Sequence, residues 1–219
     1  MDSDKLIGPI VGQQYCLSCP IDLAFTKTVA GVKHGKLAVT DVNGNILFWL
    51  DASCWKSKRM LLDAASGLPL LSITQRFWSA HDRWDAFRGD SKDEKDLLFS
   101  VKRKSMLPFQ TELQVFLATN VKENECDFKI KGEFNKRSSI IYKGNTSTVV
   151  AQMNKEHKVV NVPLEKHAFG VSIDANVDFA FITGLLFILH QLYGEEVTVL
   201  AAAVGTSAGN GAVYSVMME

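Results

Sequence analysis

The stretch VDFAFITGLLFILHQLY, residues 177–193, decides the fold of this chain, because it has the pattern of a helix that is apolar on nearly every side. At about 100° per residue, its large hydrophobic side chains point in all directions around the axis. A helix of this kind is surrounded either by protein or by lipid. The core positions that we predict for it are Phe179, Phe181, Ile182, Leu185, Leu186 and Leu189.

We expect this helix to be surrounded by protein and not by lipid. A bilayer span needs about 20 mostly apolar residues, and here Asp178 stands in the first turn while His190 and Gln191 interrupt the other end. Asn176 is a candidate N-cap and Gly194 a candidate C-terminal stop, and such signals are typical of a helix held inside a protein. We therefore predict a buried core helix, with insertion into lipid as the alternative.

Short strands precede the helix. Apolar and polar residues alternate with period two over much of residues 23–173, for example in 111–117 and 126–131, which indicates half-buried antiparallel strands. Asn43 and Gly44 stand between two such runs and predict a two-residue hairpin. Roughly a dozen runs separated by turns predict a mostly β fold, a closed antiparallel barrel around the C-terminal helix.

Length and composition favour one domain. The chain has 219 residues, and we predict a single barrel domain over 1–219, with its core over about 15–194 and an extension over 195–219 whose order the composition does not decide. The formal net charge is zero, which argues against nucleic acid as a partner. The first residues are acidic where a secretion signal is basic, so four scattered cysteines indicate reduced thiols in a cytoplasmic protein.

Several motifs occur in an order that resembles one protein family. They are DVNGN at 41–45, HDRW at 81–84, FRG at 87–89, VKRKSML at 101–107, CDF at 126–128 and NVDFAFI at 176–182. Together they resemble the plant LURP-one-related family over residues 15–193. The resemblance implies a fold similar to the tubby C-terminal domain and the phospholipid scramblases, a twelve-stranded barrel threaded by a hydrophobic helix.

The same resemblance implies a role in binding and not a reaction. The founding member of the family is linked to plant defence against a downy-mildew pathogen, and tubby domains bind phosphatidylinositol 4,5-bisphosphate through basic side chains. The implied function is a non-enzymatic protein of defence or stress signalling, cytoplasmic or peripheral at the plasma membrane. Its implied partner is an anionic phospholipid, a phosphoinositide or a membrane surface. A protein-interaction scaffold and a scramblase-like membrane-associated protein are the alternatives.

Two basic groups are candidates for lipid contact. Alternation places Lys102 and Lys104 on one face of a strand, and a second group lies beside Trp55. Each basic side chain at an anionic membrane surface contributes about 1 kcal/mol. The lipid-binding candidates are Lys56, Lys58, Arg59, Lys102 and Lys104. The alternative is that exposed strands carry lysine for solubility and edge protection, and the two groups form one site only if their strands come together.

The remaining motifs predict neither an enzyme nor a metal or cofactor site. His81 and Asp82 point to opposite faces of a strand, so an Asp–Arg pair and a packed Trp that stabilise a turn are the better interpretation. Residues 205–209 match G-x-S-x-G but have no later Asp or His. Cys16 and Cys19 have the C-x-x-C spacing without two further zinc ligands.

A protein partner, not further identified, is the second hypothesis. Trp55, Trp78 and Trp84 would anchor such a partner if their rings are exposed near turns. Burial of these rings inside the barrel would leave the basic groups as the main candidates.

Overall fold

The structure of the chain, a computed structural model, describes residues 8–26, 36–51, 58–76, 83–104, 111–133, 138–154 and 169–193. The strands are β1 (Ile21–Thr26), β2 (Lys36–Thr40), β3 (Ile46–Asp51), β4 (Lys58–Asp63), β5 (Pro69–Arg76), β6 (Arg83–Arg88), β7 (Leu97–Arg103), β8 (Thr111–Leu117), β9 (Phe128–Glu133), β10 (Ser138–Lys143), β11 (Val149–Asn154) and β12 (Phe169–Ile173). The helices are two short 3₁₀ turns, η1 (Gln13–Tyr15) and η2 (Glu94–Asp96), and the long helix α1 (Phe179–Tyr193).

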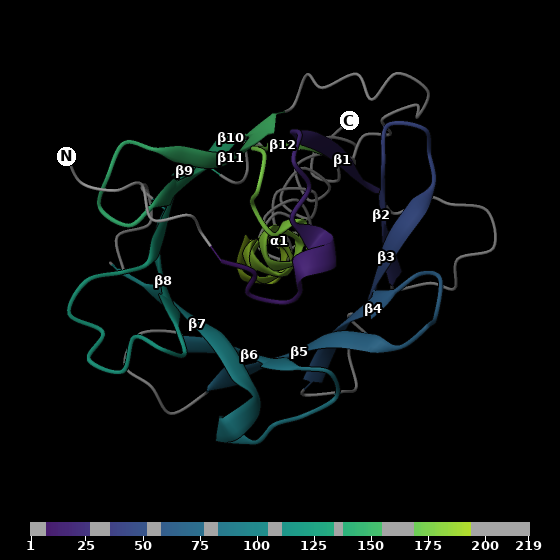
Figure 1. Ribbon diagram of the computed structural model, residues 1–219. Coiled ribbons are helices and arrows are strands. Elements are labelled where there is room, and N and C mark those ends of the chain that lie inside the picture. Colours follow the sequence, from purple (N-terminus) through teal and green to yellow (C-terminus); the bar gives the residue numbers. More distant parts are fainter. Residues whose placement is uncertain are drawn as a thin grey trace, which may run out of the picture.

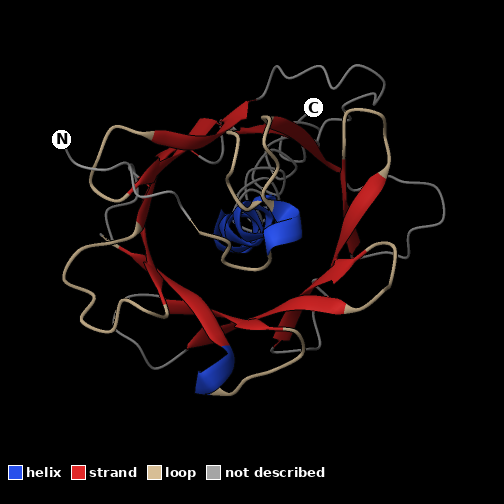
Figure 2. Cartoon of the chain, in the orientation of Figure 1, coloured by secondary structure: helices blue, strands red, loops and turns tan. Residues whose placement is uncertain are grey.

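The twelve strands of the described chain form one closed antiparallel barrel around α1 (Figures 1 and 2). Each strand pairs with its neighbours in sequence, and β1 pairs with both β2 and β12, which closes the ring. Closure leaves none of these twelve described strands with an unpaired edge that could template aggregation. The prediction of a mostly β barrel around a C-terminal helix is confirmed.

The interior of the barrel is filled by α1 and by every second side chain of the strands. Phe179 is 8% exposed and the other five predicted core positions of the helix are at most 1% exposed, so all six are confirmed. The Phe181 ring lies against two strand side chains, with its centroid 5.0 Å from that of Phe99 and 4.9 Å from that of Phe128. Gly184 lets the helix approach the wall, because a Cβ built there would lie 2.8 Å from Leu71 Cδ1.

The start of α1 differs from the prediction. The helix begins at Phe179 instead of Val177, and Asp178 replaces Asn176 as the capping residue, since its Oδ1 accepts a hydrogen bond of 3.0 Å from the Phe181 N–H. Asn176 has a φ of 61° and belongs to the turn before the helix. An N-cap residue has extended backbone, so a residue in the left-handed region does not fit that position. Asparagine is among the residues that tolerate the left-handed conformation. Gly194, the predicted stop, lies outside the described residues.

The N-terminal segment, residues 8–16, crosses the end of the barrel at which α1 begins (Figure 1). We call this end of the barrel the near end. Asp178 Oδ2 accepts hydrogen bonds from the backbone N–H groups of Ile10, Val11 and Gly12 at 2.9, 2.7 and 3.1 Å. The Tyr15 ring then packs into the core, 5.4 Å from the ring of Phe179. The segment thus covers the near end of the core.

The predicted hairpin between β2 and β3 forms, but its loop is longer than predicted. Thr40 pairs with Ile46, which leaves residues 41–45 in the loop instead of the predicted two. The reason is the Asp41 carboxylate, whose Oδ1 accepts hydrogen bonds of 2.9 Å from the backbone N–H groups of both Asn43 and Asn45. Such side-chain to backbone bonds compete with further strand pairing. Gly44 supplies the positive φ, 83°, that the turn needs.

Within the described segments, no helix combines the length and the apolar character needed to cross a membrane.

Candidate functional site

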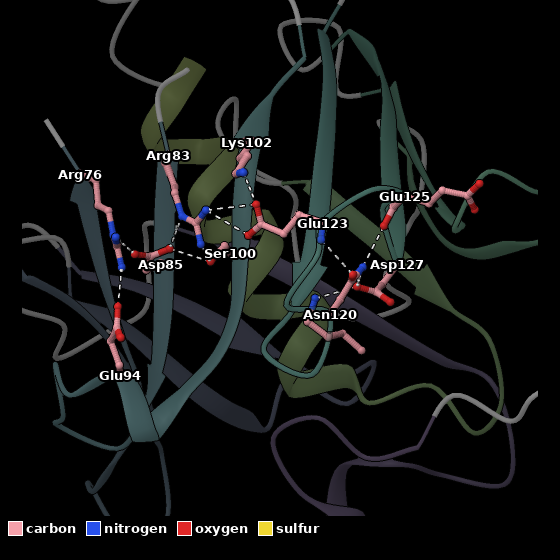
Figure 3. Close-up of polar contacts among 11 residues, drawn as sticks. Arg76, Arg83, Asp85, Glu94, Ser100, Lys102, Asn120, Glu123, Glu125 and Asp127 are labelled. Carbon is pink, nitrogen blue, oxygen red and sulfur yellow. Dashed lines mark hydrogen bonds and ion pairs between the residues drawn. The ribbon is translucent and has the colours of Figure 1, made fainter. Parts of the chain in front are cut away.

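The outer face of β5, β6 and β7 carries a group of interacting charged side chains together with one serine, which we call the charged cluster (Figure 3). Its members are Arg76, Arg83, Asp85, Glu94, Ser100, Lys102 and Glu123. Sheet register brings it together, because Arg76 pairs with Arg83 across β5 and β6, and Asp85 pairs with Ser100 across β6 and β7. Lys102 then follows Ser100 on the same face of β7.

Asp85 is the buried centre of the charged cluster, with a side chain only 1% exposed. It forms an ion pair with Arg76, its Oδ1 lies 2.9 Å from Arg83 Nε, and the Ser100 hydroxyl donates a hydrogen bond of 2.6 Å to the same oxygen. A buried carboxylate without such partners would cost several kcal/mol. These contacts therefore fix both arginine side chains in place.

Glu123 joins the charged cluster from the connection between β8 and β9, which folds back over the outer face (Figure 3). Its carboxylate accepts a hydrogen bond of 3.0 Å from Arg83 Nη1 and forms an ion pair with Lys102. Its backbone has a φ of 48°, which is uncommon for a residue other than glycine. The connection is ordered by Asn120, which donates to Asp127 Oδ2 at 2.9 Å and accepts from the Glu123 N–H at 3.2 Å.

The acid–base balance of the charged cluster follows from these contacts. Partial burial pushes the pKa of Glu123 upward, but the hydrogen bond from Lys102 and the charge of Arg83 outweigh it, so this pKa lies below its usual value. Burial likewise pushes the pKa of Arg83 downward, but its hydrogen bond with Asp85 and the carboxylate charges outweigh that effect and raise it. Both groups are therefore held in their charged forms.

The lowered pKa of Glu123 predicts how stability depends on pH. A carboxylate whose folded pKa is depressed stabilises the fold above its unfolded pKa, about 4.3 for glutamate, and loses this contribution as pH falls through the folded value. We expect Glu123→Gln to lower the free energy of unfolding by about 1 kcal/mol at neutral pH, with the difference from wild type shrinking below about pH 4. Urea denaturation at a series of pH values measures this. A difference that does not change with pH would contradict it.

The predicted basic residues do not all share one face. Lys58 donates to the backbone oxygen of Asp90 at 2.6 Å and forms an ion pair with its carboxylate, so it lies on the outer face. Arg59 points the other way, with its Cζ 4.8 Å from the centroid of the buried Trp84 ring and its Nε donating to Gln191 at 2.6 Å. Lys56 lies outside the described residues.

The other predicted group, Lys102 and Lys104, lies on the outer face. Lys102 pairs with Glu123, and Lys104 Nζ lies 2.8 Å from an oxygen of Glu112, which raises the pKa of Lys104. Lys104 follows the last residue of β7, and its backbone N–H still pairs with Glu112 on β8. The strands of the two groups, β4 and β7, are separated by β5 and β6.

Sequence reasoning missed the residues that connect the two groups, Arg76 and Arg83, together with their partner Asp85. The alternation of Arg83 and Asp85 about Trp84 could have placed both charges on one face of a strand. Arg83 and Trp84 were predicted to stabilise a turn, but they lie in β6, and Asp82 lies outside the described residues. Their strand position follows from continuous pairing with β5 up to Arg76.

The tryptophans and the cysteines were the subject of two other predictions. Trp84 is 2% exposed and therefore cannot be an exposed anchor for a partner, while Trp55 and Trp78 lie outside the described residues. Cys16, Cys19 and Cys126 carry free thiols, as predicted. Burial raises the pKa of the Cys16 and Cys126 thiols, which disfavours the reactive thiolate.

Comparisons with known proteins agree with the geometry of the barrel. The sequence profile of the LURP-one-related family matches residues 21–190. LURP-one-related 15 of Arabidopsis thaliana is 42% identical over 86% of this chain and 88% of its own length, and LURP1 of the same plant is 38% identical over 84% and 89%. An Arabidopsis thaliana protein solved by X-ray crystallography matches with a TM-score of 0.65 and 37% identity, over 84% of this chain and 98% of that chain. The chain therefore belongs to the LURP-one-related family.

Proposed function

We propose that this protein is a non-enzymatic barrel that binds anionic phospholipid, a phosphoinositide in particular, at a membrane surface in plant defence or stress signalling. The observation that carries the proposal is a row of basic side chains on the outer face of consecutive strands. The row comprises Lys58, Arg76, Arg83, Lys102 and Lys104, contributed by β4, β5, β6 and the end of β7. We call these five residues the basic row.

The charges of the basic row are balanced by carboxylates, so an anion binds through those basic side chains that remain exposed. Asp85 belongs to β6, but Asp90, Glu94 and Glu123 come from connections that fold back over the outer face. Arg76 and Lys104 are about half exposed, with 47% and 53% of their side-chain surface accessible. Phosphate groups can contact such side chains, and arginine offers a planar fork of donors that suits phosphate oxygens.

Binding to vesicles tests the proposal. We expect Lys102→Gln with Lys104→Gln to weaken co-sedimentation with vesicles containing phosphatidylinositol 4,5-bisphosphate by about thirtyfold, because each of the two basic residues contributes about 1 kcal/mol at an anionic surface and the neighbouring carboxylates remain. The salt dependence should become shallower as well. Vesicles of neutral phosphatidylcholine serve as the reference lipid.

The matched control removes two lysines that do not belong to the basic row. Lys95→Gln with Lys143→Gln makes the same change in net charge, with one lysine in η2 and the other at the end of β10. This control should bind vesicles as wild type does. Equal binding by both double variants would show that the basic row does not bind the lipid. An absence of binding by wild type would refute the lipid function.

A protein-interaction scaffold is the second candidate, and it rests on exposed aliphatic side chains instead of basic ones. Leu68 is 65% exposed in the turn between β4 and β5, and Val121 is 87% exposed in the connection between β8 and β9. Exposed aliphatic side chains on turns are suited to contact with a protein partner. Two results together would favour this function. Wild type does not bind vesicles, and a protein captured by wild type is no longer captured when Leu68 and Val121 are replaced by serine.

A further inference from the structure

We propose that the Glu123 carboxylate occupies an anion site formed by Arg83 and Lys102, and that a phosphate monoester binds there by displacing it. The inference rests on the proposed function, because it names where on the basic row the phosphate group of an anionic ligand binds. Glu123 would then limit the affinity of the protein for such ligands. A free phosphate ester and a lipid headgroup present the same chemistry to this site.

The two donors of the site converge on one point. Arg83 Nη1 lies 3.0 Å from Glu123 Oε1, and Lys102 pairs with the other oxygen of the same carboxylate (Figure 3). The donors come from adjacent strands, β6 and β7, whereas the acceptor comes from a connection between strands. Two donors placed on paired strands, with a carboxylate supplied to both by a connection, are the arrangement expected of an anion site with a built-in competitor.

The donors keep their positions without Glu123. Arg83 Nε is held by Asp85 at 2.9 Å, and Arg83 Nη2 donates to the Ser100 hydroxyl at 2.7 Å. The Lys102 ammonium lies 5.1 Å from the centroid of the Phe116 ring, which is within the range of a cation–π contact. The site is therefore preorganised, and a ligand need not order these side chains when it binds.

Glu123 is suited to leave. Its backbone has a φ of 48°, a left-handed conformation that is strained for a residue other than glycine and therefore does not favour the position that Glu123 occupies. Its side chain is 23% exposed and that of Lys102 is 27% exposed, so the ion pair can be reached from solvent. With Glu123 displaced, the three basic side chains of Arg76, Arg83 and Lys102 would stand against the two carboxylates of Asp85 and Glu94.

A phosphate monoester is the ligand that fits this exchange. It carries between one and two negative charges at neutral pH and offers three oxygens, whereas a carboxylate carries one charge on two oxygens. The Arg83 guanidinium and the Lys102 ammonium therefore gain both charge and acceptors when phosphate replaces the carboxylate. A phosphodiester, with a single charge, would gain little over Glu123.

Glu123→Gln is the decisive variant, because it removes the negative charge of the competing side chain and keeps its shape. We expect Glu123→Gln to tighten binding roughly tenfold, because the apparent affinity rises as the inverse of the fraction of molecules in which the site is open. Two probes are measured separately, soluble inositol 1,4,5-trisphosphate by calorimetry and vesicles with phosphatidylinositol 4,5-bisphosphate by co-sedimentation. Adding Lys102→Gln to Glu123→Gln should abolish the gain for both probes.

Glu112→Gln is the matched control, because Glu112 is also 23% exposed and also contacts two bases, Lys104 and Lys131. It adds the same charge and therefore measures the general electrostatic gain, which Glu123→Gln should exceed. Equal binding of both probes by Glu123→Gln and Glu112→Gln would overturn the inference and, if wild type binds vesicles, leave the proposed function intact. A gain for the soluble ester, with no binding of vesicles by wild type or by any variant, would support the inference and refute the lipid function. Binding of neither probe by any variant would refute both.

Discussion

Phe181→Asp is expected to abolish folding of the barrel. The Phe181 side chain is fully buried between the walls of the barrel, in ring contact with Phe99 and Phe128. Truncating a buried phenylalanine costs about 3–5 kcal/mol by itself, and an unpaired carboxylate in this position adds several kcal/mol more. The sum exceeds much of the range of about 5–15 kcal/mol in which whole domains are stable.

Circular dichroism during heating measures this effect. The variant should lack a cooperative transition, or should be recovered only in the insoluble fraction. Phe181→Leu is the control, since it keeps an apolar side chain at the same place and should cost only about 1–2 kcal/mol. Leu186→Lys, on the same helix and 1% exposed, should behave like the aspartate variant. A wild-type melting temperature for either charged variant would contradict the buried position of α1.

The barrel and its helix could be predicted because their signals are local. Period-two alternation, as in β8 (Thr111–Leu117), indicates which face of a strand is buried. The apolar composition of the helix indicates in the same way that it is buried on all sides. Both patterns follow from burial within one element, so no knowledge of its neighbours is needed. The bounds of β8 were predicted to the residue, whereas β9 begins at Phe128, two positions later than the run from Cys126.

The charged cluster could not be predicted in the same way, because its contacts cross the sheet. Arg76 meets Asp85 only through the register between β5 and β6, and Glu123 reaches Lys102 only because the connection after β8 folds back. Register depends on pairing between strands, which a single sequence does not encode locally. Lys102 was therefore found as a basic residue, but its partner and its neighbours Arg76 and Arg83 were not.

The N-terminal segment is a second feature that depends on long-range contacts. In the sequence, Asp178 stands out only as a charge in the first turn of an apolar helix, yet it accepts hydrogen bonds from residues that lie 166 to 168 positions earlier in the chain. Arg88 adds a contact from β6, since its Nη1 donates to the Val11 carbonyl at 2.8 Å. A carboxylate beside a helix N-terminus is common, so nothing local distinguishes one that also binds a distant segment.

Asp178→Asn should separate the two tasks of this side chain. Asparagine is as good an N-cap as aspartate, so its oxygen can still accept the Phe181 N–H. Its NH₂ group would then face the three N–H donors of Ile10, Val11 and Gly12, which Oδ2 accepts in the wild type. Because Asp178 is fully buried, water cannot replace the lost acceptor. We expect the free energy of unfolding to fall by about 3 kcal/mol or more.

Hydrogen exchange distinguishes loss of the segment from loss of the helix. The amides of Ile10, Val11 and Gly12 should exchange much faster in Asp178→Asn, while that of Phe181 stays protected, because only the first three lose their acceptor. Asp174→Asn is the control, since it makes the same charge change at an exposed position in the turn before α1 and should change stability by less than about 0.5 kcal/mol. Unchanged stability and unchanged exchange at residues 10–12 would show that Asp178 does not hold the segment. If the amide of Phe181 lost protection together with them, the carboxylate would act on the segment and the helix as one unit, because opening the near end would then expose the first turn of α1 as well.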